Sequence, residues 1–190
     1  MTDLSKENLM SQVWANEFAE IPVILAERTD LREAVLGLIN EQPMSGKVTE
    51  GGNRLGRFRE IMTALVGGKI GLAEAYRRTE LELPRLESMY GGNNRVFASG
   101  WAERLVRTQY SRFYNQAVME QLLNDGAVSC FIPHSSDEDP GSKCSRLLAG
   151  GSHDLRRLYD RLINSYARGN WANELKVPEH PHCTHVVTPG

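Results

Sequence analysis

The last eleven residues of the chain concentrate side chains that bind transition metals. Three of the five histidines and one of the three cysteines fall within six positions, between 180 and 185. Imidazole nitrogen and thiolate sulfur are the ligands that zinc prefers, and a second thiol upstream could complete a tetrahedral site. The candidate ligands are Cys144, His180, Cys183 and His185. The sequence therefore predicts a metal site at the carboxyl end, with structural zinc as the expected cofactor.

A solvated tail rich in histidine is the alternative interpretation of this cluster. Val186 and Val187 argue against it, because β-branched apolar residues after the cluster predict a short strand. Among the other possible ligands, His134 is a substitute donor. Cys130 is expected in the core, because free cysteine often fills apolar space. His153 is expected on the surface, in the first turn of a helix.

The elements that would position this cluster follow residue 126, where the apolar period changes. Apolar residues alternate over 128–132, which predicts a strand. A loop is expected over 135–143, followed by a helix over 152–166. We therefore expect a small strand–helix–strand subdomain over 127–190. A metal would clip its loop to the last strand and stabilise a unit that has little core of its own.

The preceding region, 1–126, has the spacing of helices. Its apolar residues recur every three or four positions, which places them on one face of a helix. Helices are expected over residues 9–18, 29–40, 55–66, 71–83 and 99–124. Pro22 ends the first of these runs, Ser99 is the expected N-cap of the last, and Gly126 ends that helix. Two apolar stripes on the last helix predict packing on two sides. The fold class is therefore α+β and mostly helical, an N-terminal helical bundle followed by the small C-terminal subdomain.

Size and composition restrict the class of protein. A chain of 190 residues with 41% apolar and 24% charged residues is typical of one compact domain, with or without an appended subdomain. The net charge of −2 argues against a protein devoted to bare nucleic acid. No apolar run approaches the roughly 20 residues of a membrane span. The first seven residues lack the pattern of a secretory signal, so we expect intracellular synthesis, where thiols stay reduced or bind metal.

Catalytic motifs are absent from the chain. A zinc hydrolase normally carries a helical His-Glu-x-x-His, and a nucleotide-binding loop needs an upstream glycine that Gly67-Gly68-Lys69 lacks. Asp137, Glu138 and Asp139 could supply carboxylates, but an acidic loop is usually solvated. We therefore expect that the protein is not an enzyme.

Two other functions remain open at this stage. A zinc-dependent hydrolase or nuclease-like enzyme would lose turnover, but still fold, when His182 is changed. A zinc-knuckle module that binds nucleic acid would need a basic face beside Arg156, Arg157 and Arg161, and its affinity would fall steeply with salt.

Residues 102–117, Ala-Glu-Arg-Leu-Val-Arg-Thr-Gln-Tyr-Ser-Arg-Phe-Tyr-Asn-Gln-Ala, resemble a helix of the tailed-bacteriophage head-morphogenesis proteins, the minor head proteins similar to the F protein of phage Mu. In that family a glycine turn, a strand, an Asp-led loop with cysteines, a leucine-and-glycine step and a terminal His-Pro-x-Cys-x-Cys follow in order. This chain has Asp137 or Asp139, then Cys-Ser-Arg-Leu-Leu-Ala-Gly over 144–150, then His-Pro-His-Cys-Thr-His over 180–185. The resemblance covers about residues 64–188.

The chain departs from the family pattern at three positions. Gly141 stands where the family often has the first cysteine of a Cys-x-x-Cys pair. His185 replaces the final cysteine and preserves a metal ligand. Gln109 replaces the usual glutamate, so no charged role carries over to it.

The resemblance implies a structural virion protein made in the cytoplasm of a bacterial host. It would be a minor capsid protein or a head–tail connection protein near the portal vertex. Its partners would be portal or capsid proteins and neighbouring copies in a ring, with transient contact with packaged DNA and none with a membrane.

Overall fold

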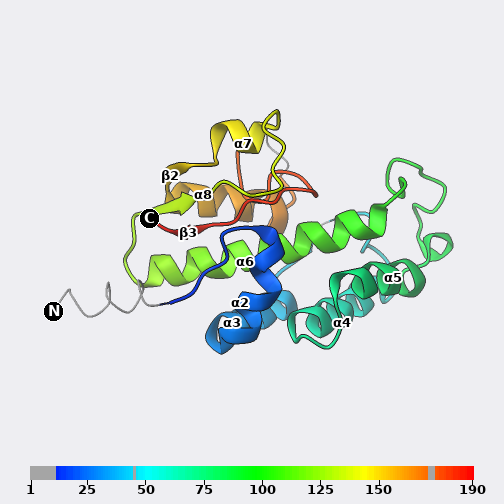
Figure 1. Cartoon of the computed structure of the whole chain (residues 1–190). Coiled ribbons are helices and arrows are strands. Elements are labelled where there is room, and N and C mark those ends of the chain that lie inside the picture. Colours follow the sequence, from blue (N-terminus) through cyan, green and yellow to red (C-terminus); the bar gives the residue numbers. More distant parts are fainter. Residues whose placement is uncertain (1–11, 45, 171–173) are drawn as a thin grey trace.

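The computed structural model describes residues 12–44, 46–170 and 174–190, which form an α+β fold that is mostly helical. This confirms the fold class that the sequence predicted. Figure 1 shows a long central helix with the N-terminal helices on one side and a small sheet with two helices on the other.

The helical elements account for most of the described chain. The α-helices are α2 (Ile21–Glu27), α3 (Thr29–Glu41), α4 (Arg54–Val66), α5 (Leu72–Glu82), α6 (Trp101–Asn124), α7 (Lys143–Leu147) and α8 (Leu155–Leu162). Single helical turns are η1 (Phe18–Glu20), η2 (Arg85–Glu87) and η3 (Ile163–Ala167), which continues α8. Helices α3 to α6 match the expected positions closely, because their apolar spacing and their glycine breakers are both local signals.

The central helix α6 is buried on two sides. It contacts α3 and α5 on one side and α8 on the other. Tyr110, Phe113, Tyr114 and Val118 are almost completely buried along it. Burial on both sides agrees with the two apolar stripes in the sequence of this helix.

The C-terminal sheet is small and antiparallel. Its strands are β1 (Ser129–Ile132), β2 (Gly151–Asp154) and β3 (Thr188–Pro189), in the order β2-β1-β3. Cys130 pairs with His153 on one side and with Pro189 on the other. The segment between β1 and β2 contains the acidic loop and α7, so β1 places this loop directly beside the incoming C-terminal segment.

The start of the chain differs from the prediction. Residues 12–17 are not helical, and Leu9 lies outside the described residues. Pro22 does not end a helix but lies in the first turn of α2, where its missing N–H is not needed. Phe18 is buried in the core, so this apolar residue covers the chain's own interior.

Three smaller predictions are also wrong. The residue before α6 is Gly100 with φ of 72°, so Ser99 is not its N-cap. His153 lies in β2 rather than in a helix, because β1 recruits these polar residues as its partner strand. The last strand is β3, one residue beyond Val187, while Val186 and Val187 are buried in the core.

The hydrophobic core runs continuously from the N-terminal helices to the C-terminal segment. The division at residue 126 stays a prediction about domain organisation. Within the described residues, no helix combines the length and the apolar character that crossing a membrane requires.

Candidate metal centre

Three of the four predicted ligands lie together. One donor atom from each of Cys144, His180 and Cys183 falls within 4.8 Å of the other two, which is close enough to hold a metal ion. The Cys144 Sγ lies 3.3 Å from the His180 Nε2. The fourth predicted ligand is adjacent, since the His185 Nδ1 lies 3.6 Å from the Cys183 Sγ. These donors come from two segments that are 36 residues apart in the sequence.

The short helix α7 positions Cys144. Ser142 is its N-cap, and the Ser142 hydroxyl oxygen accepts a hydrogen bond of 3.2 Å from the backbone N–H of Ser145. The same hydroxyl lies 3.3 Å from the Cys144 Sγ. The cap therefore starts the helix and orients the thiol in its first turn.

The C-terminal segment carries the other donors, and hydrogen bonds of its backbone fix its position. A turn brings His180 and Cys183 together, because the Cys183 N–H donates to the His180 carbonyl at 3.0 Å. The Phe18 N–H donates to the Thr184 carbonyl at 2.8 Å. The Val187 N–H donates to the Asn115 Oδ1 at 2.7 Å. The segment is thus fixed on η1 and on α6 on either side of His185.

The two thiols differ in acidity. The Cys144 pKa lies well below its usual value, because the Cys183 thiol hydrogen-bonds to it and two histidines add further hydrogen bonds. The pKa of Cys183 is raised by that same contact and by burial. The thiolate is the form of cysteine that binds metals, so the lowered pKa of Cys144 favours this residue as a ligand.

Cys130 has a different role. Burial raises its pKa to about 12, and it lies on β1, outside the group of candidate metal ligands. The expectation that it belongs to the core is confirmed.

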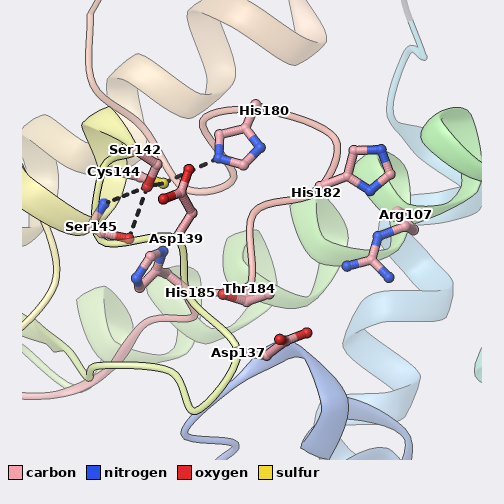
Figure 2. Close-up of a pocket in the computed structure, with 10 residues that line it drawn as sticks. All are labelled: Arg107, Asp137, Asp139, Ser142, Cys144, Ser145, His180, His182, Thr184 and His185. Carbon is pink, nitrogen blue, oxygen red and sulfur yellow. Dashed lines mark hydrogen bonds between the residues drawn. The ribbon is translucent and has the colours of Figure 1, made fainter.

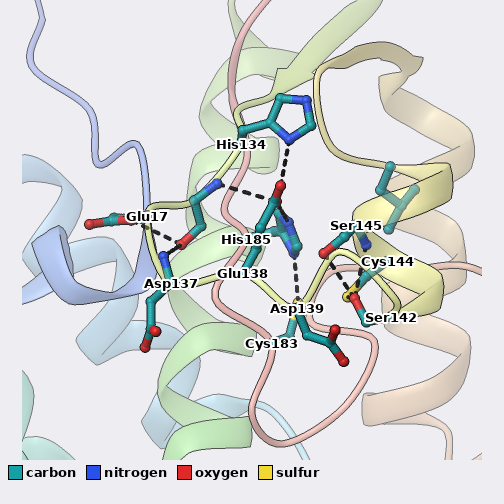
Figure 3. Close-up of polar contacts among 12 residues, drawn as sticks. Glu17, His134, Asp137, Glu138, Asp139, Ser142, Cys144, Ser145, Cys183 and His185 are labelled. Carbon is teal, nitrogen blue, oxygen red and sulfur yellow. Dashed lines mark hydrogen bonds and ion pairs between the residues drawn. The ribbon is translucent and has the colours of Figure 1, made fainter.

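Glu138, which the sequence predicts to lie in a solvated loop, contacts His185. The Glu138 Oε2 lies 2.7 Å from the His185 Nε2, and its Oε1 lies 2.7 Å from the His134 Nδ1 (Figure 3). Burial alone would lower the pKa of His185, but contacts with Cys144 and Glu138 outweigh it, so the pKa is raised. No local pattern reveals this contact, because 47 residues separate the two partners.

The loop that carries Glu138 is held by the N-terminal segment. The Glu17 carboxylate accepts hydrogen bonds from the Ser135 hydroxyl at 2.9 Å and from the Ser136 backbone N–H at 2.6 Å. These hydrogen bonds lower the pKa of Glu17, with Ser136 as the main cause. A residue near the start of the chain thus positions the acidic loop beside the donors.

A cleft of about 420 Å³ lies against the cluster. Cys144 and His180 line one end of it, and Arg107 and His182 lie beside each other at the other end (Figure 2). The Arg107 guanidinium lies 4.4 Å above the Phe18 ring and forms no salt bridge with any described carboxylate. The cleft thus borders the candidate donors Cys144 and His180.

The remaining sequence candidates lie elsewhere. The His134 ring is mostly exposed and contacts Glu138 rather than the thiols. The His153 Nε2 lies 2.7 Å from the Leu148 carbonyl oxygen. The arginines of α8, namely Arg156, Arg157 and Arg161, line a shallow pocket together with Asp154, Asp160 and Glu174. Alternating charges of this kind do not make the continuous basic face that a nucleic acid would need.

Comparisons of the chain with protein-family models, with curated proteins and with solved structures found no match.

Proposed function

We propose that this chain is a structural subunit of a tailed-bacteriophage head, in which a zinc ion held by Cys144, His180, Cys183 and His185 stabilises the C-terminal region. The subunit would be a minor capsid or head–tail connection protein near the portal vertex. The observation that carries the metal proposal is the convergence of two buried thiols, the buried imidazole of His185 and the half-buried imidazole of His180 from two distant segments. The resemblance of residues 64–188 to minor head proteins supports the place in the virion.

Zinc fits the chemistry of these donors. Two sulfur and two nitrogen ligands form the tetrahedral set of structural zinc sites, and soft thiolates disfavour magnesium and calcium. Cys144, Cys183 and His185 are each at most 2% exposed. A set of four protein donors, three of them buried, would leave no open position for a substrate, which favours a structural ion over a catalytic one.

A bound zinc ion would stabilise the region around the small sheet. Strands of four, four and two residues cannot provide much stability on their own. A metal bound between α7 and the C-terminal segment would join the two ends of this region directly. The result would be a rigid surface for contact with portal protein, capsid protein or neighbouring copies.

Elemental analysis of the purified protein, together with its mass in solution, tests this proposal. We expect one zinc per chain and a ring-sized assembly. The Cys183→Ser variant should lose the zinc and fold or assemble poorly, whereas Cys130→Ala should retain the metal. A metal-free monomer would contradict both parts of the proposal.

A zinc-dependent hydrolase is the second candidate, and the cleft beside the donors is the observation that favours it. In that case Cys144, His180 and Cys183 would hold the metal, which would activate water, and Arg107 with His182 would bind an anionic substrate. The His182→Ala variant separates the two functions. A structural subunit should keep its fold and its assembly with this change, whereas a hydrolase should keep its fold and lose turnover of phosphodiester or ester substrates.

A further inference from the structure

The Glu138 carboxylate lies between two histidines and is largely shielded from water. Its Oε2 is 2.7 Å from the His185 Nε2, and its Oε1 is 2.7 Å from the His134 Nδ1. The Glu138 side chain is 15% exposed and that of His185 only 1%. Glu138 is therefore a mostly buried acceptor aimed at a completely buried imidazole, which is unlike the solvated acid that its sequence context suggests.

The contact determines which nitrogen of His185 is left for another partner. A carboxylate at Nε2 favours the tautomer that carries its proton there, so that the lone pair lies on Nδ1. The Nδ1 atom faces the thiols, 3.6 Å from the Cys183 Sγ. Metal-binding histidines usually donate their second ring N–H to a carboxylate or carbonyl in this way.

We propose that Glu138 is the positioning residue of the metal site, holding His185 as the fourth ligand through Nδ1. This inference rests on the proposed zinc site and extends it to a residue outside the ligand set. Glu138 does not touch the ion; it acts by fixing the ring orientation and the tautomer of a ligand.

The surrounding loop supports this role. The Ser135 backbone N–H donates to the Glu138 Oε2 at 3.4 Å, and the Glu138 N–H donates to the Ser135 carbonyl at 3.4 Å. The loop itself is bound through Ser135 and Ser136 to Glu17. The neighbouring Asp139 is engaged locally, since its Oδ1 accepts from the Gly141 N–H at 2.9 Å. Glu138 is thus held in place from both the loop and the N-terminal segment.

Metal affinity of the full-length protein provides the first test. Zinc is titrated in competition with a chromophoric chelator into Glu138→Ala, Glu138→Gln and the control Asp137→Asn. We expect Glu138→Ala to weaken zinc binding by about 10- to 100-fold. Glu138→Gln retains an oxygen acceptor for the Nε2 proton and should recover most of the affinity, and Asp137→Asn should match the unaltered protein.

Cobalt substitution provides a readout that a general loss of stability would not change. Co²⁺ bound to the unaltered protein should give the intense visible bands of a tetrahedral site, and Glu138→Ala should shift or weaken them. In a His185→Ala background, the further change Glu138→Ala should have no additional effect on affinity, because the residue that it positions is gone.

The outcomes distinguish this inference from the proposed function. If the unaltered protein binds neither zinc nor cobalt, the zinc site and the role of Glu138 both fail. If it binds zinc while Glu138→Ala and Asp137→Asn behave alike, the zinc site stands and the role of Glu138 is overturned. A full Glu138→Ala effect in the His185→Ala background would likewise overturn it.

Discussion

Asn115 connects the central helix to the C-terminal segment with a single side chain. Its Nδ2 donates to the Ser111 carbonyl at 2.8 Å, and its Oδ1 accepts from the Val187 N–H at 2.7 Å. The residue is completely buried, as is Val187. A buried backbone N–H that loses its acceptor cannot form a hydrogen bond with water instead. The side-chain amide of Asn115 is therefore important for stability.

Replacing Asn115 by leucine should therefore destabilise the protein. The change keeps the approximate size of the side chain and leaves the Val187 N–H without a partner, at a cost of about 1–3 kcal/mol in the free energy of unfolding. Urea denaturation measures the difference. The matched control Asn124→Leu lies at the exposed end of the same helix and should change stability by about 0.5 kcal/mol or less. Equal effects at the two positions would contradict the importance of the Val187 contact.

At the scale of the elements, the connection from α7 to β2 depends on Gly150. This residue has φ of 71°, a conformation that costs other residues energy, and its N–H donates to the Ile132 carbonyl at 2.8 Å. A Cβ at this position would clash with the ring of His134. Gly126, after α6, also has a positive φ, of 81°, but has open space around its Cα. A substitution at Gly126 therefore tests backbone strain alone, whereas one at Gly150 tests backbone strain together with steric crowding.

Alanine at each glycine should show this difference. Gly126→Ala should cost about 1–2 kcal/mol, the penalty of a left-handed conformation. Gly150→Ala should cost the same strain and, by displacing His134 from Glu138, up to about 1 kcal/mol more. Urea denaturation in a His134→Ala background checks the cause, since the excess at Gly150 should vanish there. An excess that persists without the imidazole would show that crowding by His134 is not its source.

At the scale of the whole molecule, the segments that carry the candidate metal ligands share one core with the helices. Val186 and Val187 are completely buried, and they belong to the same apolar cluster as the side chains of α6. The C-terminal segment also contacts η1 through the Phe18 N–H. Loss of the metal should thus weaken the whole fold rather than one end of it.

Removal of metal by a chelator should lower the melting temperature in a single transition. In a protein of this size each kcal/mol corresponds to roughly 2–4 °C, so a contribution of several kcal/mol predicts a decrease of about 10 °C or more. Differential scanning calorimetry with and without chelator measures it, and added zinc should restore the original value. The Cys183→Ser variant should not respond to the chelator. Two separate transitions, or an unchanged melting temperature, would argue against this coupling.

Several features could be predicted from the sequence because they depend on near neighbours. The helices α3 to α6 follow from apolar spacing, and Gly67, Gly68 and Gly126 mark where two of them end. The donor types and their spacing from 180 to 185 identified the cluster, and Cys130 was placed correctly in the core. Each of these inferences uses the types and spacing of residues that lie close together in the sequence.

Other features depended on how distant segments pack. The strand β2 forms because β1 pairs with it, and the helix α7 has only five residues, too few for a periodic signal. Glu138 contacts His185 only because the fold brings residues 138 and 185 together. Residue types and local periods thus determined the helices and the set of donors. The tertiary structure decided which donors meet and which carboxylate contacts them, because contacts across 36 to 47 residues depend on the packing of the entire chain.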